Sequence, residues 1–412
     1  MGNSLSKYNR FYIFLFIIWS PLHRYVLHFD AAGRTVVFLS VLAVLLNLSE
    51  FWKLRKTLFS PALICWSVLL CYSLINATIK GFSSDGGVFH FYKVNFLEPF
   101  IFLVITTLEL FKDKQKTLKV IWNALGIYIL MGLPFMVRSS HDRVMAEGLG
   151  NMYPLKTVVF FFVTSILYVE RKIKTMPFII LVLFVSLLIL LSGTRKAFGA
   201  ELILLIGLVL YAGGKRSLWR WTRVALTGGM LLVGVRIALD NSRVGERLVE
   251  GLDEETALAW SEYDIQLINN QAANDLLIQL LDDRAIQYAL GLDLFRIHPW
   301  TGIGLTNFIE ESGYPYRLHT EYMVQLCENG IVGFALLIFF YVLMIKSLRK
   351  RDGAKRPRVV GMALFGLIAI LFINITAWTY NADYAMITYA IIFAYANYYD
   401  NENSNPSSKR VV

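Results

Sequence analysis

Arginines at the expected outer ends of hydrophobic helices are the residues in this sequence best suited to chemistry. The set is Arg195, Arg236, Arg243, Arg247, Arg284, Arg296 and Arg317. The positive-inside bias of membrane proteins works against basic residues on that side, so these residues need another reason to be there. A guanidinium group binds phosphate through two parallel hydrogen bonds and keeps its charge. The arginine set therefore suits a diphosphate or an acidic glycan as ligand.

A histidine follows these arginines. The sequence after Arg284 predicts a helix that ends at Pro299, a turn at Gly302 and Gly304, and a short loop that delivers His319 to the outer mouth of the next span. Such a glycine pair is more often a tight turn than a phosphate cradle, and a single histidine at a helix end is more often a cap than a base. The pattern predicts an arginine and a histidine at one cavity rim.

Helices in a membrane must position these residues. Hydrophobic residues make up 56% of the 412 residues and charged residues 17%. Apolar runs recur along the chain with the length of roughly 20 residues that a membrane span needs. The sequence predicts an all-α polytopic membrane protein with about 12 transmembrane helices. These helices are expected near residues 10–28, 35–50, 58–78, 91–111, 118–137, 155–170, 176–192, 197–213, 224–240, 320–345, 359–378 and 383–399.

The basic residues predict the orientation of these helices. With the N-terminus in the cytoplasm, 25 of the 40 Lys and Arg fall on the cytoplasmic side, as the positive-inside rule requires. Most of the net charge of +10 then comes from basic residues that set the orientation of the helices in the membrane, which argues against a nucleic-acid partner. We expect both termini in the cytoplasm and the candidate residues on the other face of the membrane.

Four regions follow from this topology. Residues 1–239 carry nine helices, 240–319 form a large non-cytoplasmic loop, 320–399 carry three more helices, and 400–412 form a cytoplasmic tail. The first half of the loop is acidic and is interpreted as a solvated surface. Its second half, 272–295, has apolar residues at helical spacing, which predicts amphipathic helices that lie on the membrane or cover a cavity.

Three motifs lie in the stretch 190–333. They are Ser192-Gly-Thr-Arg195, the pattern from Arg284 to Phe308 with its Pro and Gly-x-Gly, and His319 followed by Glu328-x-Gly330-x-x-Gly333. Together these motifs resemble the bacterial O-antigen polymerase and O-antigen ligase superfamily. The family usually has His-Asn where this chain has His319-Thr320. The resemblance implies a C-type membrane glycosyltransferase with an outward active site.

The resemblance also implies roles for particular residues and a set of partners. Arg195 and Arg284 would hold the diphosphate of an undecaprenyl-diphosphate-linked oligosaccharide, and His319 would be the catalytic residue, without metal or cofactor. The residues Lys196, Arg296, His298 and Arg317 are further candidates for substrate binding. The acceptor would be a lipid-linked glycan or lipid A-core at the periplasmic face of the bacterial inner membrane, and a chain-length regulator is a candidate partner.

Three functions remain open at this point. A polymerase extends a lipid-linked repeat unit of O-antigen or capsule, and a ligase moves the finished glycan to lipid A-core. The short segment between Phe308 and His319 favours the polymerase, because it leaves little surface for a large core oligosaccharide. A transporter of lipid-linked glycans predicts charges buried within spans, whereas the helix interiors of this sequence are expected to be almost free of ionisable groups.

Overall fold

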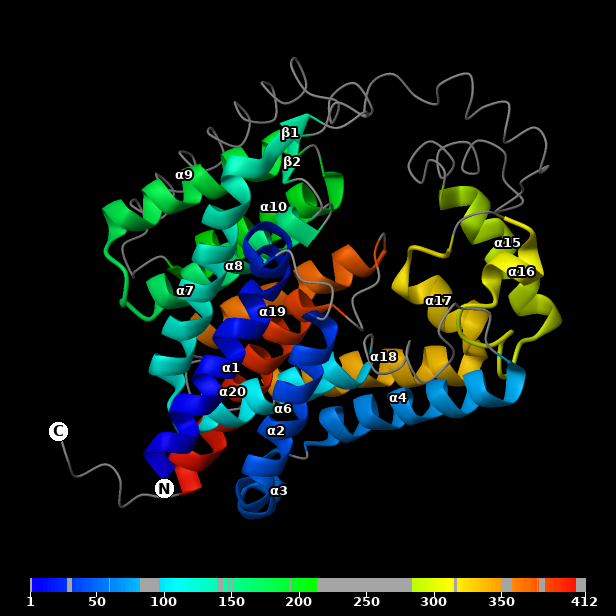
Figure 1. Ribbon diagram of the computed structural model, residues 1–412, viewed down its shortest axis with the longest axis horizontal. Coiled ribbons are helices and arrows are strands. Elements are labelled where there is room, and N and C mark those ends of the chain that lie inside the picture. Colours follow the sequence, from blue (N-terminus) through cyan, green and yellow to red (C-terminus); the bar gives the residue numbers. More distant parts are fainter. Residues whose placement is uncertain are drawn as a thin grey trace.

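The computed structural model gives the chain a predominantly helical fold (Figure 1). It describes residues 2–27, 32–58, 60–81, 96–138, 144–146, 149, 152–192, 194–212, 284–314, 317–349, 358–375, 377 and 382–404. The α-helices are α1 (Gly2–Leu22), α2 (Ala32–Lys53), α3 (Arg55–Leu58), α4 (Pro61–Lys80), α6 (Glu98–Lys112), α7 (Lys114–Gly132), α8 (Met152–Val169), α9 (Thr175–Leu191), α10 (Arg195–Ala212), α15 (Arg284–Ile297), α16 (Phe308–Ser312), α17 (Glu321–Glu328), α18 (Gly330–Arg349), α19 (Arg358–Asn374) and α20 (Asp383–Ser404).

Five helices in the described ranges are long and apolar enough to cross a membrane: α2, α4, α7, α8 and α18. Three shorter apolar helices, α9, α19 and the first part of α20, accompany them. Together they support a multi-pass membrane protein, while the number of about 12 spans stays a prediction. The helix expected at 224–240 and the loop from 240 to 283 lie outside the described residues.

Side-chain caps explain where several helices begin. The Ser60 hydroxyl accepts a hydrogen bond from the Leu63 N–H, and Pro61 occupies the first position of α4, where a missing N–H costs nothing. Asp113 caps α7 in the same way by accepting from the Lys116 N–H. Asp113 also follows the last residue of α6, so this cap marks the boundary between α6 and α7.

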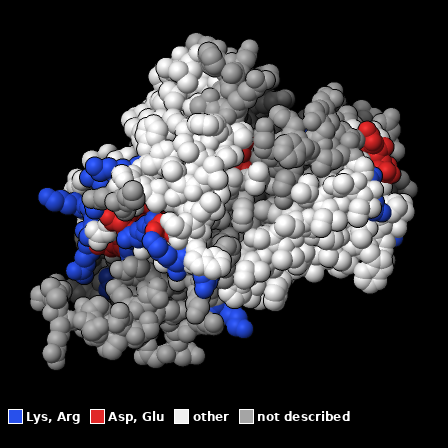
Figure 2. Space-filling model, turned by 60° about the horizontal axis from the view of Figure 1, so that its bottom comes forward, with Lys and Arg blue, Asp and Glu red and all other residues white. Residues whose placement is uncertain are grey.

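Basic side chains gather at one end of the face in Figure 2, with a broad belt of uncharged residues beside them. Ion pairs join Lys112 to Glu50 at 3.2 Å and Lys114 to Glu170 at 3.0 Å, and Glu170 also accepts a hydrogen bond from the Tyr395 hydroxyl. The end of α2 therefore meets the end of α6, and the start of α7 meets the end of α8 beside α20. Basic clusters that are far apart in the sequence lie on one side of the bundle, as the predicted topology requires.

One expectation about secondary structure needs correction. The helix expected over 320–345 is two helices, because α17 ends at Glu328 and the backbone turns at Gly330, whose φ of 66° belongs to the left-handed region. The helical fold bears out the all-α expectation, and beside the helices lies one short antiparallel pair, β1 (Met136–Arg138) with β2 (Val144–Ala146). This pair follows α7 and its 3-10 turn (Leu133–Phe135), and the sequence there has no alternating apolar pattern to signal it.

The helix interiors also hold ionisable groups that the sequence was expected to lack. Lys156 of α8 is buried, and its ammonium group contacts the Asp383 carboxylate, the Ile17 carbonyl at 3.2 Å and the face of the Tyr128 ring at 4.2 Å. Glu201 of α10 is buried as well. A buried charge is tolerated where it is paired, and Lys156 meets that condition.

The helices α15, α16 and α17 pack on one another beside the ends of α4 and α18, away from the start of α1 (Figure 1). We call residues 284–328 the α15–α17 unit. Its two longer helices lie close together, since a Cβ added at Gly291 of α15 would lie 2.8 Å from the methyl group of Met323 in α17. This unit carries most of the residues that the sequence singles out for chemistry.

Candidate active site

A glycine-rich clasp joins the α15–α17 unit to the start of α18; it consists of residues 299–307 and 327–333. The Ile303 N–H donates to the Cys327 carbonyl at 3.0 Å, and the Gly304 N–H donates to the Glu328 carbonyl at 2.9 Å. A Cβ at Gly302 would lie 2.4 Å from the Cys327 carbonyl oxygen. No side chain fits there, so the glycine serves close contact between backbones.

Gly330 closes the clasp from the other side. A Cβ at this position would lie 2.3 Å from the carbonyl oxygen of Trp300, and φ at Gly330 is 66°. The Ile331 N–H donates to the Pro299 carbonyl at 2.8 Å. The Gly-x-Gly pair and the Gly330 motif thus hold each other, which confirms the interpretation of Gly302 and Gly304 as a tight turn.

The last turns of α4 seal the clasp. The Asn76 amide donates to the Thr301 carbonyl at 2.8 Å and to the Glu328 carbonyl at 3.0 Å, and the Tyr72 hydroxyl donates to the Asn329 carbonyl at 3.0 Å. Sequence analysis did not single out Asn76 or Tyr72. The available signal was polar side chains in an otherwise apolar helix, spaced four residues apart on one face.

Glu328 is the buried carboxyl group of the clasp. Its side chain is 1% exposed, the Thr306 N–H donates to its carboxyl group, and Oε2 has no hydrogen-bond partner among the described residues. Burial raises the pKa of Glu328 to about 8, while the Thr306 N–H and the Arg317 charge oppose that shift. Thr306 has a φ of 68°, so a strained backbone position presents this N–H.

His319 directly precedes Thr320, the N-cap residue of α17, and its side chain is exposed. The His319 N–H donates to Oε1 of Gln287, a buried residue of α15, at 3.2 Å. Position 287 is one helical turn after Arg284, so the backbone at the start of α15 lies near His319. The side chain of Arg284 is outside the described residues. Gln287 was missed in the sequence, where one amide in an amphipathic helix gives little signal.

Thr320 has a structural task at the position where the family usually has asparagine. Its hydroxyl accepts a hydrogen bond from the Met323 N–H at 3.2 Å and caps α17, and its side chain is fully buried. Asparagine and threonine are both good N-cap residues. The substitution therefore preserves the cap that fixes the chain direction at His319.

The C-terminal end of α19 brings α10, α15 and α17 together. The Tyr322 hydroxyl of α17 donates to the Leu371 carbonyl at 3.1 Å, and the Tyr288 hydroxyl of α15 donates to the Ile375 carbonyl at 2.9 Å. These carbonyls lack helical partners because α19 ends there. Burial raises the pKa of Tyr322 to about 12, so its phenol remains a donor at neutral pH.

Arg195 reaches the same place from α10. Position 199 lies one turn after it on the same helical face, and a Cβ at Gly199 would lie 2.3 Å from the ring of Phe372 in α19. The link before α10 is shaped by the buried Ser192, whose hydroxyl donates to the Ile189 carbonyl at 2.7 Å and accepts from the Thr194 N–H at 3.3 Å. Arg195 is half-buried. The contacts thus gather the starts of α10, α15 and α17 around the end of α19.

The other candidates divide between two places. Lys196 follows Arg195, and Arg317 lies near Glu328 and two residues before His319. Arg296 and His298 lie at the opposite end of α15 from Gln287, roughly 15 Å along the helix axis. Arg296 is exposed there and pairs with Asp293 at 2.8 Å. The structure therefore does not bring Arg296 and His298 to the end of α19. The arginines at 236, 243 and 247 lie outside the described residues.

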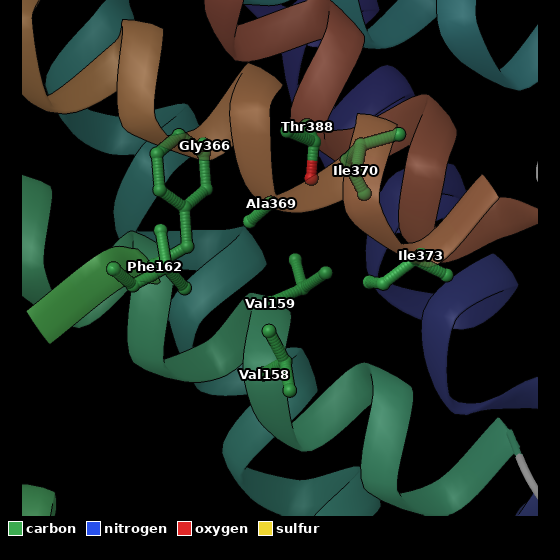
Figure 3. A pocket seen from close by; sticks show the side chains of 9 residues that line it. Val158, Val159, Phe162, Gly366, Ala369, Ile370, Ile373 and Thr388 are labelled. Carbon is green, nitrogen blue, oxygen red and sulfur yellow. The ribbon is translucent and has the colours of Figure 1, made fainter. Parts of the chain in front are cut away.

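A small cavity lies between α8, α10, α19 and α20 (Figure 3). Its lining is apolar apart from Thr388 and includes Val159, Phe162 and Ile370. None of the candidate residues lines it. We assign this cavity to imperfect packing where the helices cross, rather than to a binding site.

Comparison with known proteins covers this same part of the chain. Residues 179–338 match the family model described as O-antigen ligase, a span from α9 into α18 that contains Arg195, Arg284 and His319. No curated relative matches the chain. Members of the matched family are glycosyltransferase-like enzymes of lipopolysaccharide and polysaccharide synthesis. The match at residues 179–338 supports the resemblance of this part of the chain to the O-antigen polymerase and ligase superfamily.

Proposed function

We propose that this protein polymerises repeat units of a surface polysaccharide, O-antigen or capsule, that are carried on undecaprenyl diphosphate. One observation carries the proposal: three segments that begin with Arg195, Arg284 and His319 converge at the end of α19, within the segment that matches the family. A diphosphate donor needs fixed cations, and an acceptor hydroxyl needs a base. The three residue types meet both needs.

In the proposed reaction, the imidazole of His319 takes the proton of the acceptor hydroxyl. The acceptor oxygen attacks the anomeric carbon on the face opposite the diphosphate, which inverts that centre. The bond between this carbon and the phosphate oxygen breaks, and its electron pair leaves with the diphosphate. The guanidinium groups of Arg195 and Arg284 stabilise the developing charge, so the scheme uses neither metal nor cofactor.

The surroundings of His319 support this role. Its side chain is exposed, while the backbone there is fixed by Gln287 and by the Thr320 cap. Catalysis depends on a reactive group being held in a defined place. A base on an accessible side chain with an anchored backbone meets this requirement.

We also propose that the basic end of the bundle faces the cytoplasm of a bacterial inner membrane. Both termini would then be cytoplasmic, and the end of α19 with the α15–α17 unit would face the periplasm. The grouped basic residues support this orientation through the positive-inside rule. A periplasmic site suits a donor whose glycan has already crossed the membrane.

The ligase is the second candidate, and the description of the matched family model favours it. A ligase would use the same donor and transfer its glycan to lipid A-core. The short segment before His319 favours the polymerase, because its described residues hold only α16 and a turn. A lipid-linked glycan transporter would account for the buried Lys156 and Glu201, but it gives no role to a histidine beside the arginines.

Incubation of the purified, reconstituted protein with lipid-linked repeat units tests the proposal. We expect a ladder of lengthened lipid-linked glycans without any further acceptor. Transfer that occurs only after addition of lipid A-core would establish the ligase instead. Movement of the substrate across vesicle membranes without a new glycosidic bond would establish the transporter.

A further inference from the structure

The turn after α15 exposes two large apolar side chains. Ile297 is 68% exposed and Trp300 is 72% exposed. The residues that follow the turn, from Gly302 to Phe308, are buried, so the turn has one side packed in the clasp and one side bare. An exposed apolar surface of this kind marks a place that another protein or a membrane covers.

The backbone of this turn lies on the first residues of the α18 span. The Pro299 carbonyl accepts from the Ile331 N–H at 2.8 Å, and the Trp300 carbonyl accepts from the Val332 N–H at 3.4 Å. The side chains of Ile331 and Val332 are exposed and begin the apolar outer surface of a helix long enough to cross a membrane. The bare side of the turn is therefore continuous with a surface that lipid covers.

The α4 span extends this apolar surface. Asn76 of α4 donates to the Thr301 carbonyl, which places the last turn of this helix next to Trp300. Ile75 and Ile79, on either side of Asn76, are exposed large hydrophobic residues. Exposed apolar side chains from two spans and from the turn thus lie together at one end of both spans.

We propose that the turn 297–300 is a membrane anchor, seated in the interface of the leaflet at the ends of α4 and α18, with phospholipid as its partner. Tryptophan favours this zone because its ring is apolar and its indole N–H reaches polar groups. The exposed pair of Asp293 and Arg296, one turn back on α15, lies on the polar side of the interface. The anchor fixes one end of α15 to the bilayer.

The anchor has a consequence that rests on the proposed function. Because α15 joins the anchor at one end to the start that carries Arg284 at the other, the anchor sets the height of the active site above the membrane. A donor whose diphosphate emerges from the same leaflet would meet the site at a fixed depth. Loss of the anchor would then lower transfer from lipid-embedded donor while leaving the fold intact.

Fluorescence quenching in liposomes tests the anchor without any assay of activity. The chain has nine tryptophans, so the emission of Trp300 is obtained as the difference between the wild type and Trp300→Phe. We expect this difference emission to be quenched at least twofold by phospholipids brominated near the headgroup end of the acyl chain, and to resist iodide in the aqueous phase. Quenching by iodide without quenching by brominated lipid would overturn the proposal, as would quenching by neither.

A second reporter guards against a local effect of the Phe substitution. In the Trp300→Phe background, Ile297→Trp moves the indole by three residues on the same bare side, and the same quenching pattern is expected. Separately, Trp300→Ser should lower transfer in liposomes about fivefold, whereas Trp300→Phe should retain it. If quenching supports the anchor but neither variant changes transfer, the anchor stands and its link to the active site is wrong.

Discussion

The motif residues of this chain fall into two regions with opposite surroundings. The glycine clasp is buried, and its motif residues Gly302, Glu328 and Gly330 bind backbone to backbone. The other region, which we call the rim, is formed by the starts of α10, α15 and α17 around the end of α19. It presents an exposed His319 and a half-buried Arg195. Under the proposed function, the motif residues of the clasp specify a scaffold and those of the rim specify chemistry. Substitutions in the clasp should damage fold and activity together, and substitutions at the rim should damage activity alone.

The largest effect is expected for Gly330→Ala. The new Cβ would lie 2.3 Å from a backbone oxygen in a left-handed conformation, so both steric overlap and backbone strain oppose the fold. We expect folded protein to be lost, measured as the monodisperse fraction after detergent extraction. Gly313→Ala is the matched control, because Gly313 has a φ of 69° but open space around it. Equal losses in both variants would show that strain alone, and not the clasp contact, is responsible.

A substitution at the rim should lower activity without the loss of folded protein expected for Gly330→Ala. Arg195→Gln is expected to lower transfer from the diphosphate donor roughly 100-fold, as is typical when one stabilising group of a transition state is removed. The thermal unfolding temperature should stay within a few degrees of wild type. Lys196→Gln, one residue along the same helix, is the control and should have a much smaller effect. Similar losses from both variants would contradict the role of Arg195 as a specific diphosphate ligand.

Gln287 holds the backbone of His319 at the rim, and its substitution should show an intermediate effect. Gln287→Leu leaves the His319 N–H without its acceptor, which costs about 1–3 kcal/mol of folding stability. The backbone at the rim is then held less firmly. We expect transfer to fall roughly tenfold, mainly in the turnover number rather than in donor affinity. Gln287→Glu keeps an acceptor and should recover most of the rate. A rate unchanged in Gln287→Leu would mean that this hydrogen bond does not position His319.

The smallest effect concerns the pH dependence of the clasp. Because burial raises the pKa of Glu328 to about 8, the unfolded chain ionises this group at lower pH than the folded protein does. Stability from the protonated carboxyl is thus fully present near pH 4.5 and is lost as the pH rises toward 8. Thermal unfolding temperatures should fall over this range by several degrees. Glu328→Gln should flatten that dependence, and an equally steep fall in the variant would assign it to another group.

Much of the helical layout could be read from the sequence. Long apolar runs predict helices, and basic clusters predict that their ends share one side, since both signals are local and strong. The break at Gly330 was missed because the apolar pattern continues across it, and only contact with Trp300 shows why the chain turns there. The buried Lys156 was missed because its partner Asp383 is far along the chain.

The sequence also identified the candidate residues, but it did not predict which of them lie close together. The resemblance to a family singled out Arg195, Arg284 and His319. The contacts of Tyr288 and Tyr322 with α19 bring the starts of α15 and α17 to the end of that helix. No periodicity predicts that these two phenols donate to the free carbonyls of a distant helix. The same contacts place His298 and Arg296 elsewhere, a division that the sequence order of the residues conceals.

The most direct test of the central claim compares His319→Ala with His298→Ala in liposomes that contain lipid-linked repeat units. Both histidines belong to the same part of the chain, but His319 adjoins the end of α15 near α19 and His298 adjoins the other end. We predict that His319→Ala forms no glycan ladder while its unfolding temperature matches wild type, and that His298→Ala retains the ladder. Ladder formation by folded His319→Ala at the wild-type rate would contradict the account.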